Sequence, residues 1–163
     1  MTSFVVRPVK PADRARVDAF LAASWSDFVA RRGELVDARR EEALLAERDG
    51  EGALAGVVTL VQRGDQLEVL TLNAAERLQG VGTALLDAAV EVARSRACRR
   101  VWLITTNYNV DALRFYQRRG LRLARIDTGA VDWSRLTLKP GIPDVGLHGI
   151  PIRDELELEL ILE

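Results

Sequence analysis

The sequence contains few of the residues that build metal sites and disulfides. Its 163 residues include one cysteine, Cys98, and one histidine, His148. A single cysteine cannot form an internal disulfide, and these two residues cannot supply a cluster of cysteine and histidine ligands. No metal site is therefore predicted, although a cation site made only of carboxylates is left open. We expect Cys98 and His148 to have structural roles.

Long apolar runs and an excess of one charge are also absent. No apolar run approaches the length of a membrane-spanning helix, and the first residues, MTSFVVRPVK, lack the layout of a signal peptide. The formal net charge is -1, which gives no overall attraction to nucleic acid. We expect a cytoplasmic protein with neither a nucleic-acid nor a membrane partner. The length suits a single domain over residues 1–163.

The hydropathy pattern predicts interleaved strands and helices. Strands are expected at 3–9, on both sides of an Arg-Gly-Asp turn at 63–65, at 99–106, at 121–129 and at 154–163. Helices are expected at 11–25, within 26–52, after Gly82 and after Asn109, and residues 129–150 are expected to form a loop. Because several strands are joined as hairpins, the fold class is α/β (α+β), with a mixed, mostly antiparallel sheet flanked by helices.

The tail, DELELELILE, alternates between leucine and acidic residues. Side chains on a strand alternate between its two faces, so the leucines would lie on one face and the glutamates on the other. The pattern predicts a half-buried strand with its glutamates in solvent. It leaves open a homodimer formed through this strand.

The stretch RLQGVGTALLDAA places two glycines directly before an apolar-striped helix. Glycines at a helix start allow either a tight turn or an anion site, because the first N–H groups of a helix have no partner within it. A Walker loop is excluded, since no lysine lies near Gly80 or Gly82. A dinucleotide fingerprint is excluded as well, because Leu85 stands where its third glycine is required. A turn without a ligand stays open.

A second pattern lies downstream, where Asn109, Ala112, Tyr116 and Gly120 follow the spacing N-x-x-A-x-x-x-Y-x-x-x-G. The first stretch contains the pattern Arg77-x-x-Gly80-x-Gly82. With these two patterns in this order, the sequence resembles the GNAT superfamily of acyl-CoA-dependent N-acyltransferases. The resemblance covers about residues 56–127, with Leu121 in place of the usual phenylalanine. It implies acetyl-CoA as cosubstrate, bound where the strand before the glycine turn splays from its parallel neighbour. It also implies a small-molecule or peptide amine as acceptor.

The resemblance implies roles for particular residues. Tyr116 would protonate or hydrogen-bond the departing thiolate, and Glu68 would remove a proton from the acceptor amine through water, although solvent itself could do so. The residues implied in cofactor binding are Leu70, Thr71, Leu72, Arg77, Gln79, Gly80, Val81, Gly82, Thr83, Ala84, Asn107, Asn109, Ala112 and Tyr116. Asn109 could equally be a helix cap.

Three aromatic residues, Trp25, Phe28 and Trp133, are candidates for the acceptor pocket. Trp25 and Phe28 are placed on N-terminal helices, which shape the acceptor side in GNAT proteins. The implied mechanism is direct attack of the amine on the thioester in a ternary complex. The alternative of another class is an acyl-CoA-binding sensor or structural protein that catalyses no transfer.

Overall fold

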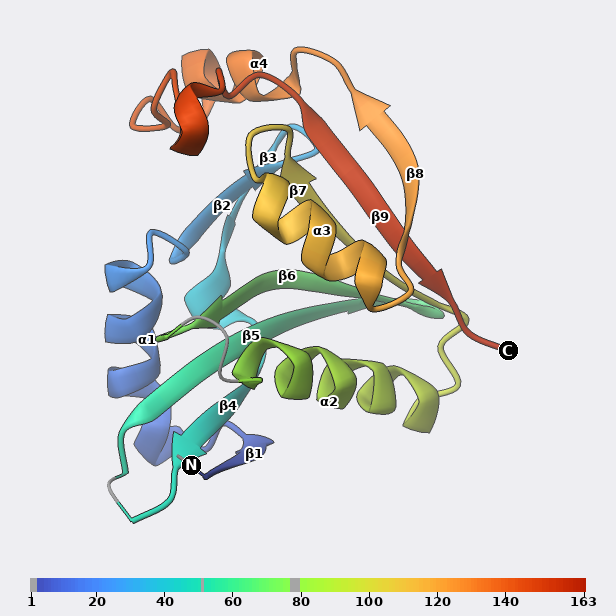
Figure 1. Cartoon of the computed structure of the whole chain (residues 1–163). Helices are drawn as coiled ribbons and strands as arrows, with labels where there is room; N and C mark the ends of the chain where they lie inside the picture. Colours follow the sequence, from blue (N-terminus) through green and yellow to red (C-terminus); the bar gives the residue numbers. More distant parts are fainter. Residues whose placement is uncertain (1–2, 51, 77–79) are drawn as a thin grey trace. The chain divides into compact units, whose positions relative to one another are not determined.

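The structure is a computed structural model that describes residues 3–50, 52–76 and 80–163. Seven strands belong to one mostly antiparallel sheet, and helices accompany them (Figure 1). The fold class that the sequence predicts is therefore confirmed. The chain divides into two compact units, unit 1 with residues 1–28, 37–101 and 162–163, and unit 2 with residues 29–36 and 102–161. The prediction of one domain over residues 1–163 stays a prediction.

Unit 1 is built on four antiparallel strands in the order β1-β4-β5-β6, with bounds Phe4–Pro8, Glu42–Arg48, Leu54–Arg63 and Gln66–Ala74. Strands β5 and β6 form the predicted hairpin, since Arg63 pairs with Gln66 across a two-residue turn. The helical segments are η1 (Pro11–Asp13), α1 (Arg14–Ala23), η2 (Ala38–Arg40) and α2 (Val81–Ser95). Helix α2 packs on β4, β5 and β6, and α1 packs on β5.

The apolar stripe of α2 explains its place in unit 1. Leu85, Leu86, Ala89 and Ala93 recur at helical spacing, and all four are buried. Gly56 on β5 allows the first turn of the helix to come close to the sheet. A Cβ at that position would lie 2.7 Å from the carbonyl oxygen of Asn73 and 2.8 Å from Val81 Cγ1. The start of α2 is therefore held beside the end of β6.

Unit 2 contains the strands β7 (Arg100–Thr106), β8 (Arg122–Asp127) and β9 (Glu155–Ile161) in the order β7-β9-β8. Strands β8 and β9 are antiparallel. The helical segments are α3 (Val110–Arg118), α4 (Ala130–Thr137) and η3 (Leu147–Gly149), and a separate hairpin joins β2 (Phe28–Arg31) to β3 (Glu34–Asp37). Strands β2, β3 and β7 each have one or two end residues in unit 1.

The helix predicted within residues 26–52 is wrong, because this segment forms β2, β3, η2 and β4. The turn between β2 and β3 has φ of 49° at Arg32 and 73° at Gly33. Positive φ at both central residues is the geometry of a two-residue hairpin turn, and it breaks a helix. The many charged residues of this segment conceal the strand pattern.

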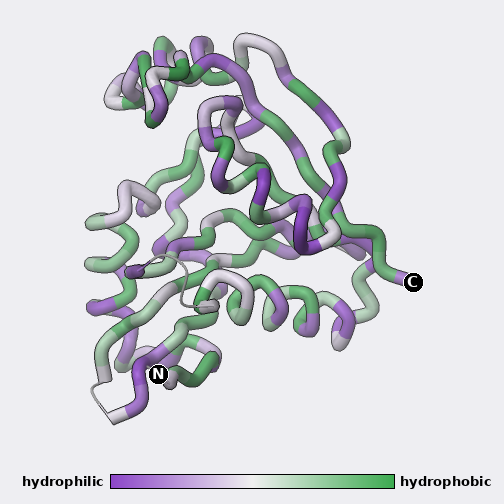
Figure 2. Tube along the Cα trace, viewed as in Figure 1, coloured by the Kyte–Doolittle hydropathy of each residue, from purple (hydrophilic) through white to green (hydrophobic). Residues whose placement is uncertain are grey.

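Two further expectations need correction. Residues 130–137, predicted to be loop, form α4, and the backbone N–H of Gly129 before it donates to Asp154 Oδ1 at 2.8 Å. On β9 the alternation of residue type is real, as Figure 2 shows in its changing colours. However, Glu155 and Glu157 are buried together with their leucine neighbours. Strand β9 is covered on both faces, so these glutamates do not lie in solvent.

Candidate functional site

The glycine turn of unit 1 leaves the start of α2 without a cap from the described residues. Gly80, at the N-cap position, has φ of 78°, and no side chain caps the helix. Ala84 N–H donates to Gly80 O at 3.0 Å, whereas the earlier N–H groups have no acceptor within the helix. A Cβ on Gly80 would meet nothing within 4 Å. These bare donors and the helix dipole suit an anion. Arg77 and Gln79 lie outside the described residues.

Strand β6 carries a β-bulge just before this turn. Thr71 pairs with Thr59 and Val69 with Leu60, so Leu70 is an extra residue with no Cα partner on β5. A bulge disrupts the ladder locally and redirects the strand, and such bulges are frequent beside active sites. The hydroxyls of Thr59 and Thr71 lie 2.6 Å apart, and Thr71 N–H donates to Thr59 Oγ1 at 3.1 Å. The buried threonine pair therefore holds the bulge in place.

Two polar residues of β6 are relevant to ligand binding. Glu68 is 2% exposed, and the strand is buried continuously from Leu67 to Thr71. Strict alternation along β6 would place Glu68 on one strand face with Leu70 and Leu72, but the bulge at Leu70 interrupts this alternation. At the end of β6, Asn73 Oδ1 is buried without a hydrogen-bond partner in the described chain. That oxygen can accept an N–H group from a ligand.

Tyr116 lies on α3 in unit 2 and is half-buried. Burial raises the pKa of the Tyr116 phenol to about 12. The phenol is therefore neutral at physiological pH and carries a proton that it can donate in a hydrogen bond. Its ring meets that of Phe115 edge to face, with 5.3 Å between the ring centroids.

The two asparagines of this region make hydrogen bonds within unit 2. Asn109 Oδ1 accepts from Ala112 N–H at 3.2 Å and caps α3, as one of the two sequence interpretations predicts. Asn107 Oδ1 accepts from the backbone N–H groups of Arg153 and Asp154, and Asn107 Nδ2 donates to Pro151 O at 2.8 Å. The Asn107 side chain thus holds the segment that leads into β9.

The three aromatic candidates for an acceptor pocket are distributed over both units. Trp25 follows α1 and is 72% exposed, and Phe28 begins β2, so neither lies on a helix as the sequence reasoning expected. The guanidinium of Arg39 lies over the Phe28 ring. Trp133 is on α4, and its ring lies beside Gly33, with Cζ3 3.7 Å from the position that a Cβ would take there.

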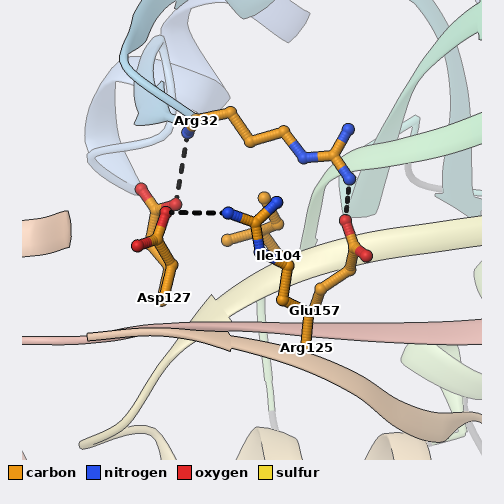
Figure 3. A pocket seen from close by; sticks show the side chains of 6 residues that line it. Arg32, Ile104, Arg125, Asp127 and Glu157 are labelled. Carbon is orange, nitrogen blue, oxygen red and sulfur yellow. Dashed lines mark hydrogen bonds and ion pairs between the residues drawn. The ribbon is translucent and has the colours of Figure 1, made fainter.

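A small pocket in unit 2 is lined by residues that the sequence reasoning did not select (Figure 3). They are Arg32, Ile104, Arg125, Asp127, Glu155 and Glu157. Arg32 reaches Glu157 with its guanidinium, and its backbone N–H donates to Glu155 Oε2 at 3.2 Å. The only sequence signal for this pocket is the glutamate pattern of the tail, and this pattern is equally typical of a solvated strand face. The residues that contact these glutamates come from distant segments of the sequence.

Glu155 is the most deeply buried carboxyl group of this pocket. It is 3% exposed, and burial raises its pKa above the ordinary value of 4.5. The N–H of Arg32 opposes this rise, whereas the negative charge of Asp127 adds to it. Glu155 Oε1 has no hydrogen-bond partner among the described residues. The pocket therefore contains a carboxylate oxygen that is buried and unsatisfied.

We expect Glu155→Gln to raise the thermal unfolding midpoint at pH 7–8, with the gain shrinking toward pH 4. A raised folded-state pKa means that the neutral acid contributes stability at low pH, which is lost as the pH rises through that pKa. Glutamine stays neutral at every pH and still accepts from the Arg32 N–H. Midpoints from pH 4 to 8 check this, with the exposed-site variant Asp144→Asn as control. A gain that does not vary with pH contradicts it.

Two further features are absent from the described residues. No group of three or more histidine, cysteine, aspartate or glutamate residues there could hold a metal ion. No helix in those ranges is long and apolar enough to cross a membrane. The single cysteine, Cys98, is buried, and His148 Nε2 lies 3.7 Å from Asp111 Oδ2.

Comparisons with known proteins agree with this architecture. The sequence profile of the acetyltransferase (GNAT) family matches residues 12–121. An uncharacterized protein of Bacillus subtilis, YxbD, is 43% identical over 118 residues, 69% of this chain and 74% of its own. The streptothricin acetyltransferase of Streptomyces lavendulae is 30% identical over 126 residues, 77% of this chain and 66% of its own. A Bacillus subtilis acetyltransferase solved with CoA has a TM-score of 0.67 at 20% identity, with full coverage of both chains.

The chain belongs to the GNAT acetyltransferase family. The family that the two sequence motifs indicate is therefore confirmed. Acetyl-CoA is the usual cosubstrate of this family. The uncapped helix start behind Gly80 and the unpartnered Asn73 oxygen suit such a ligand, because they offer donors to a pyrophosphate and an acceptor to an amide.

Proposed function

We propose that the protein is an N-acetyltransferase that moves the acetyl group of acetyl-CoA to an amine in a ternary complex. The observation that carries this proposal is the combination, within unit 1, of a bulged strand and an uncapped helix start that follows it. The bulge at Leu70 interrupts the pairing of β6 with β5, and Gly80 lies at the N-cap position where α2 begins. We assign pantetheine contacts to Leu70–Leu72 and pyrophosphate contacts to Gly80–Ala84.

The chemistry requires two bonds to form and two to break. The neutral amine nitrogen attacks the acetyl carbonyl carbon and the C–S bond breaks, while one N–H proton leaves the nitrogen and a proton is added to the sulfur, so the products are the N-acetylated amine and CoA. An alkyl amine with a pKa near 10.4 is almost entirely protonated at pH 7, so a proton must first leave. We assign its removal to Glu68, through water, because this carboxylate lies next to the bulge on β6.

The leaving thiolate then needs a hydrogen-bond donor, and we assign this role to Tyr116. A phenol with a pKa of about 12 is a weaker acid than a thiol near 8.5, so complete proton transfer from the phenol to the released thiolate is unfavourable by about 5 kcal/mol. Hydrogen bonding to the developing charge does not have this cost. Cys98 is 5% exposed, which argues against a covalent acyl-cysteine intermediate.

Thermal unfolding with acetyl-CoA, desulfo-CoA and ATP tests binding first. At about 100 times its dissociation constant, a ligand adds about 2.7 kcal/mol and raises the midpoint by about 5–10 °C. We expect this rise with both CoA species and not with ATP. Gly80→Ala should weaken CoA binding by about tenfold or more, whereas Gly64→Ala should not. Both glycines have positive φ and open space around them, so the two variants have comparable backbone strain.

Initial-velocity kinetics with a panel of primary amines then test transfer. A ternary complex gives intersecting double-reciprocal lines, and a covalent intermediate gives parallel lines. Binding of CoA without its release by any amine would indicate the sensor alternative and contradict the enzyme proposal. Loss of binding in both glycine variants would mean that Gly80 acts through backbone strain alone.

A further inference from the structure

We propose that the pocket of unit 2 binds a cationic nitrogen of the acceptor, so that acceptors with a second ammonium group are preferred. The inference rests on the proposed function in taking the ligand to be the acceptor. The pocket is the one lined by Arg32, Ile104, Arg125, Asp127, Glu155 and Glu157.

The strand register places two carboxylates opposite each other in this pocket. Asp127 on β8 pairs with Glu155 on β9, and Arg125 pairs with Glu157. Directly opposite residues on antiparallel strands have Cβ atoms about 4.5–5.5 Å apart, and like charges at such positions repel each other. Arg125 lies 3.6 Å from Asp127 Oδ2 but is itself largely exposed. A cation seated between Asp127 and Glu155 would relieve the repulsion.

One oxygen of this carboxylate pair is ready to accept a hydrogen bond. Glu155 is almost completely buried, its Oε2 accepts from Arg32 N–H, and its Oε1 has no hydrogen-bond partner within the described ranges. Leaving such an acceptor unsatisfied is unfavourable, and more so when it is charged. The raised pKa of Glu155 reflects the same burial. An N–H donor that carries a positive charge would give Glu155 Oε1 a hydrogen-bond partner and would also stabilise the ionised carboxylate.

One cationic side chain of the protein is already held by a carboxylate in this pocket. The Arg32 guanidinium donates to Glu157, and its central carbon lies 4.0 Å from the centroid of the Trp102 ring. A carboxylate and an aromatic face together recognise an organic cation. Figure 3 shows Arg32 reaching to Glu157 and Arg125 reaching to Asp127. A metal ion fits this pocket poorly, because no group of ligands for one occurs among the described residues.

The binding test compares butylamine with 1-butanol, which has the same chain and no cationic group. Calorimetric titration of the full chain without acetyl-CoA should show butylamine binding at least about tenfold more tightly. Asp127→Asn should remove this preference and leave the weak 1-butanol binding unchanged. The control variant, Asp144→Asn, removes an 89% exposed carboxylate of the same unit outside the pocket and should keep the preference.

Kinetics with 1,4-diaminobutane and butylamine separate this proposal from the proposed function. Asp127→Asn should raise KM for the diamine by about tenfold, with kcat and the butylamine KM little changed, because the one nitrogen of butylamine reacts outside the pocket. Acetylation of both amines with unaltered KM values in the variant supports the enzyme and overturns the pocket. Selective butylamine binding that is lost in Asp127→Asn, without acetylation of any amine, supports the pocket and overturns the enzyme. Equal binding of butylamine and 1-butanol by the unaltered protein overturns the pocket proposal.

Discussion

Tyr116→Phe is expected to lower kcat by about 10- to 1,000-fold while changing KM for acetyl-CoA by no more than about twofold. The substitution removes one hydroxyl and keeps the ring, so the edge-to-face contact with Phe115 is preserved. If Tyr116 hydrogen-bonds the leaving thiolate, the loss falls on the transition state and not on ground-state binding. Steady-state kinetics with a fixed acceptor measure both constants.

The control for this experiment is Tyr108→Phe, because the chain has two tyrosines and both belong to unit 2. The Tyr108 ring packs so closely on Gly146 that a Cβ at that position would collide with the ring. Loss of the Tyr108 hydroxyl should leave kcat unchanged. A Tyr116→Phe enzyme with unaltered kcat removes Tyr116 from the mechanism.

The pH profile provides an independent measurement on Tyr116. Since burial raises the pKa of this phenol to about 12, the hydroxyl keeps its proton through pH 10. We therefore expect that ionisation of Tyr116 causes no fall in kcat between pH 8 and 10. Any fall that occurs in this range should also occur in Tyr116→Phe. A basic limb that does disappear in this variant would show an ordinary or lowered pKa in the complex.

Removal of residues 154–163 is expected to prevent folding. The segment contains β9, which lies between β7 and β8, and its buried leucines are Leu156, Leu158 and Leu162. Burial of each contributes about 1.5–3 kcal/mol. Their sum is comparable with the total stability of an ordinary domain, about 5–15 kcal/mol. Circular dichroism and thermal unfolding of the shortened chain measure this directly, and a cooperative transition near that of the full chain contradicts it.

A single substitution on the same strand gives a graded version of the experiment. Leu158 is completely buried, and Leu158→Ala should cost about 2–5 kcal/mol in the free energy of unfolding. Ile161 is 61% exposed, so Ile161→Ala should cost much less. Equal losses for the two variants would mean that burial along β9 is not what stabilises it.

The elements with a strong local signal were predicted correctly. Helix α2 follows from its apolar stripe, the β5–β6 hairpin from its glycine turn, and the start of α3 from Asn109. Each depends on neighbours within a few positions in the sequence. The described residues of the two motifs that indicate the family lie on or directly beside α2 and α3, which is why the family could be inferred before the structure.

The features that were missed depend on distant partners. Glu155 and Glu157 read as solvated residues because alternation gives the two faces of a strand but not what covers each face. Their partner Arg32 comes from a turn more than 100 positions earlier, in a segment predicted to be helical. The bulge at Leu70 depends on the register with β5, which no local pattern encodes. The pocket of unit 2 could therefore not be predicted from the sequence.

The position of β9 in its sheet has a consequence for biosynthesis. In chain order β7 and β8 come first, yet β9 lies between them. While a ribosome is still translating residues 128–154, β8 has been made but the strand that pairs with it has not. Incomplete chains in this state have an unpaired strand edge, which makes them prone to aggregation and to chaperone capture. Slow translation over this interval should thus lower the yield of native protein.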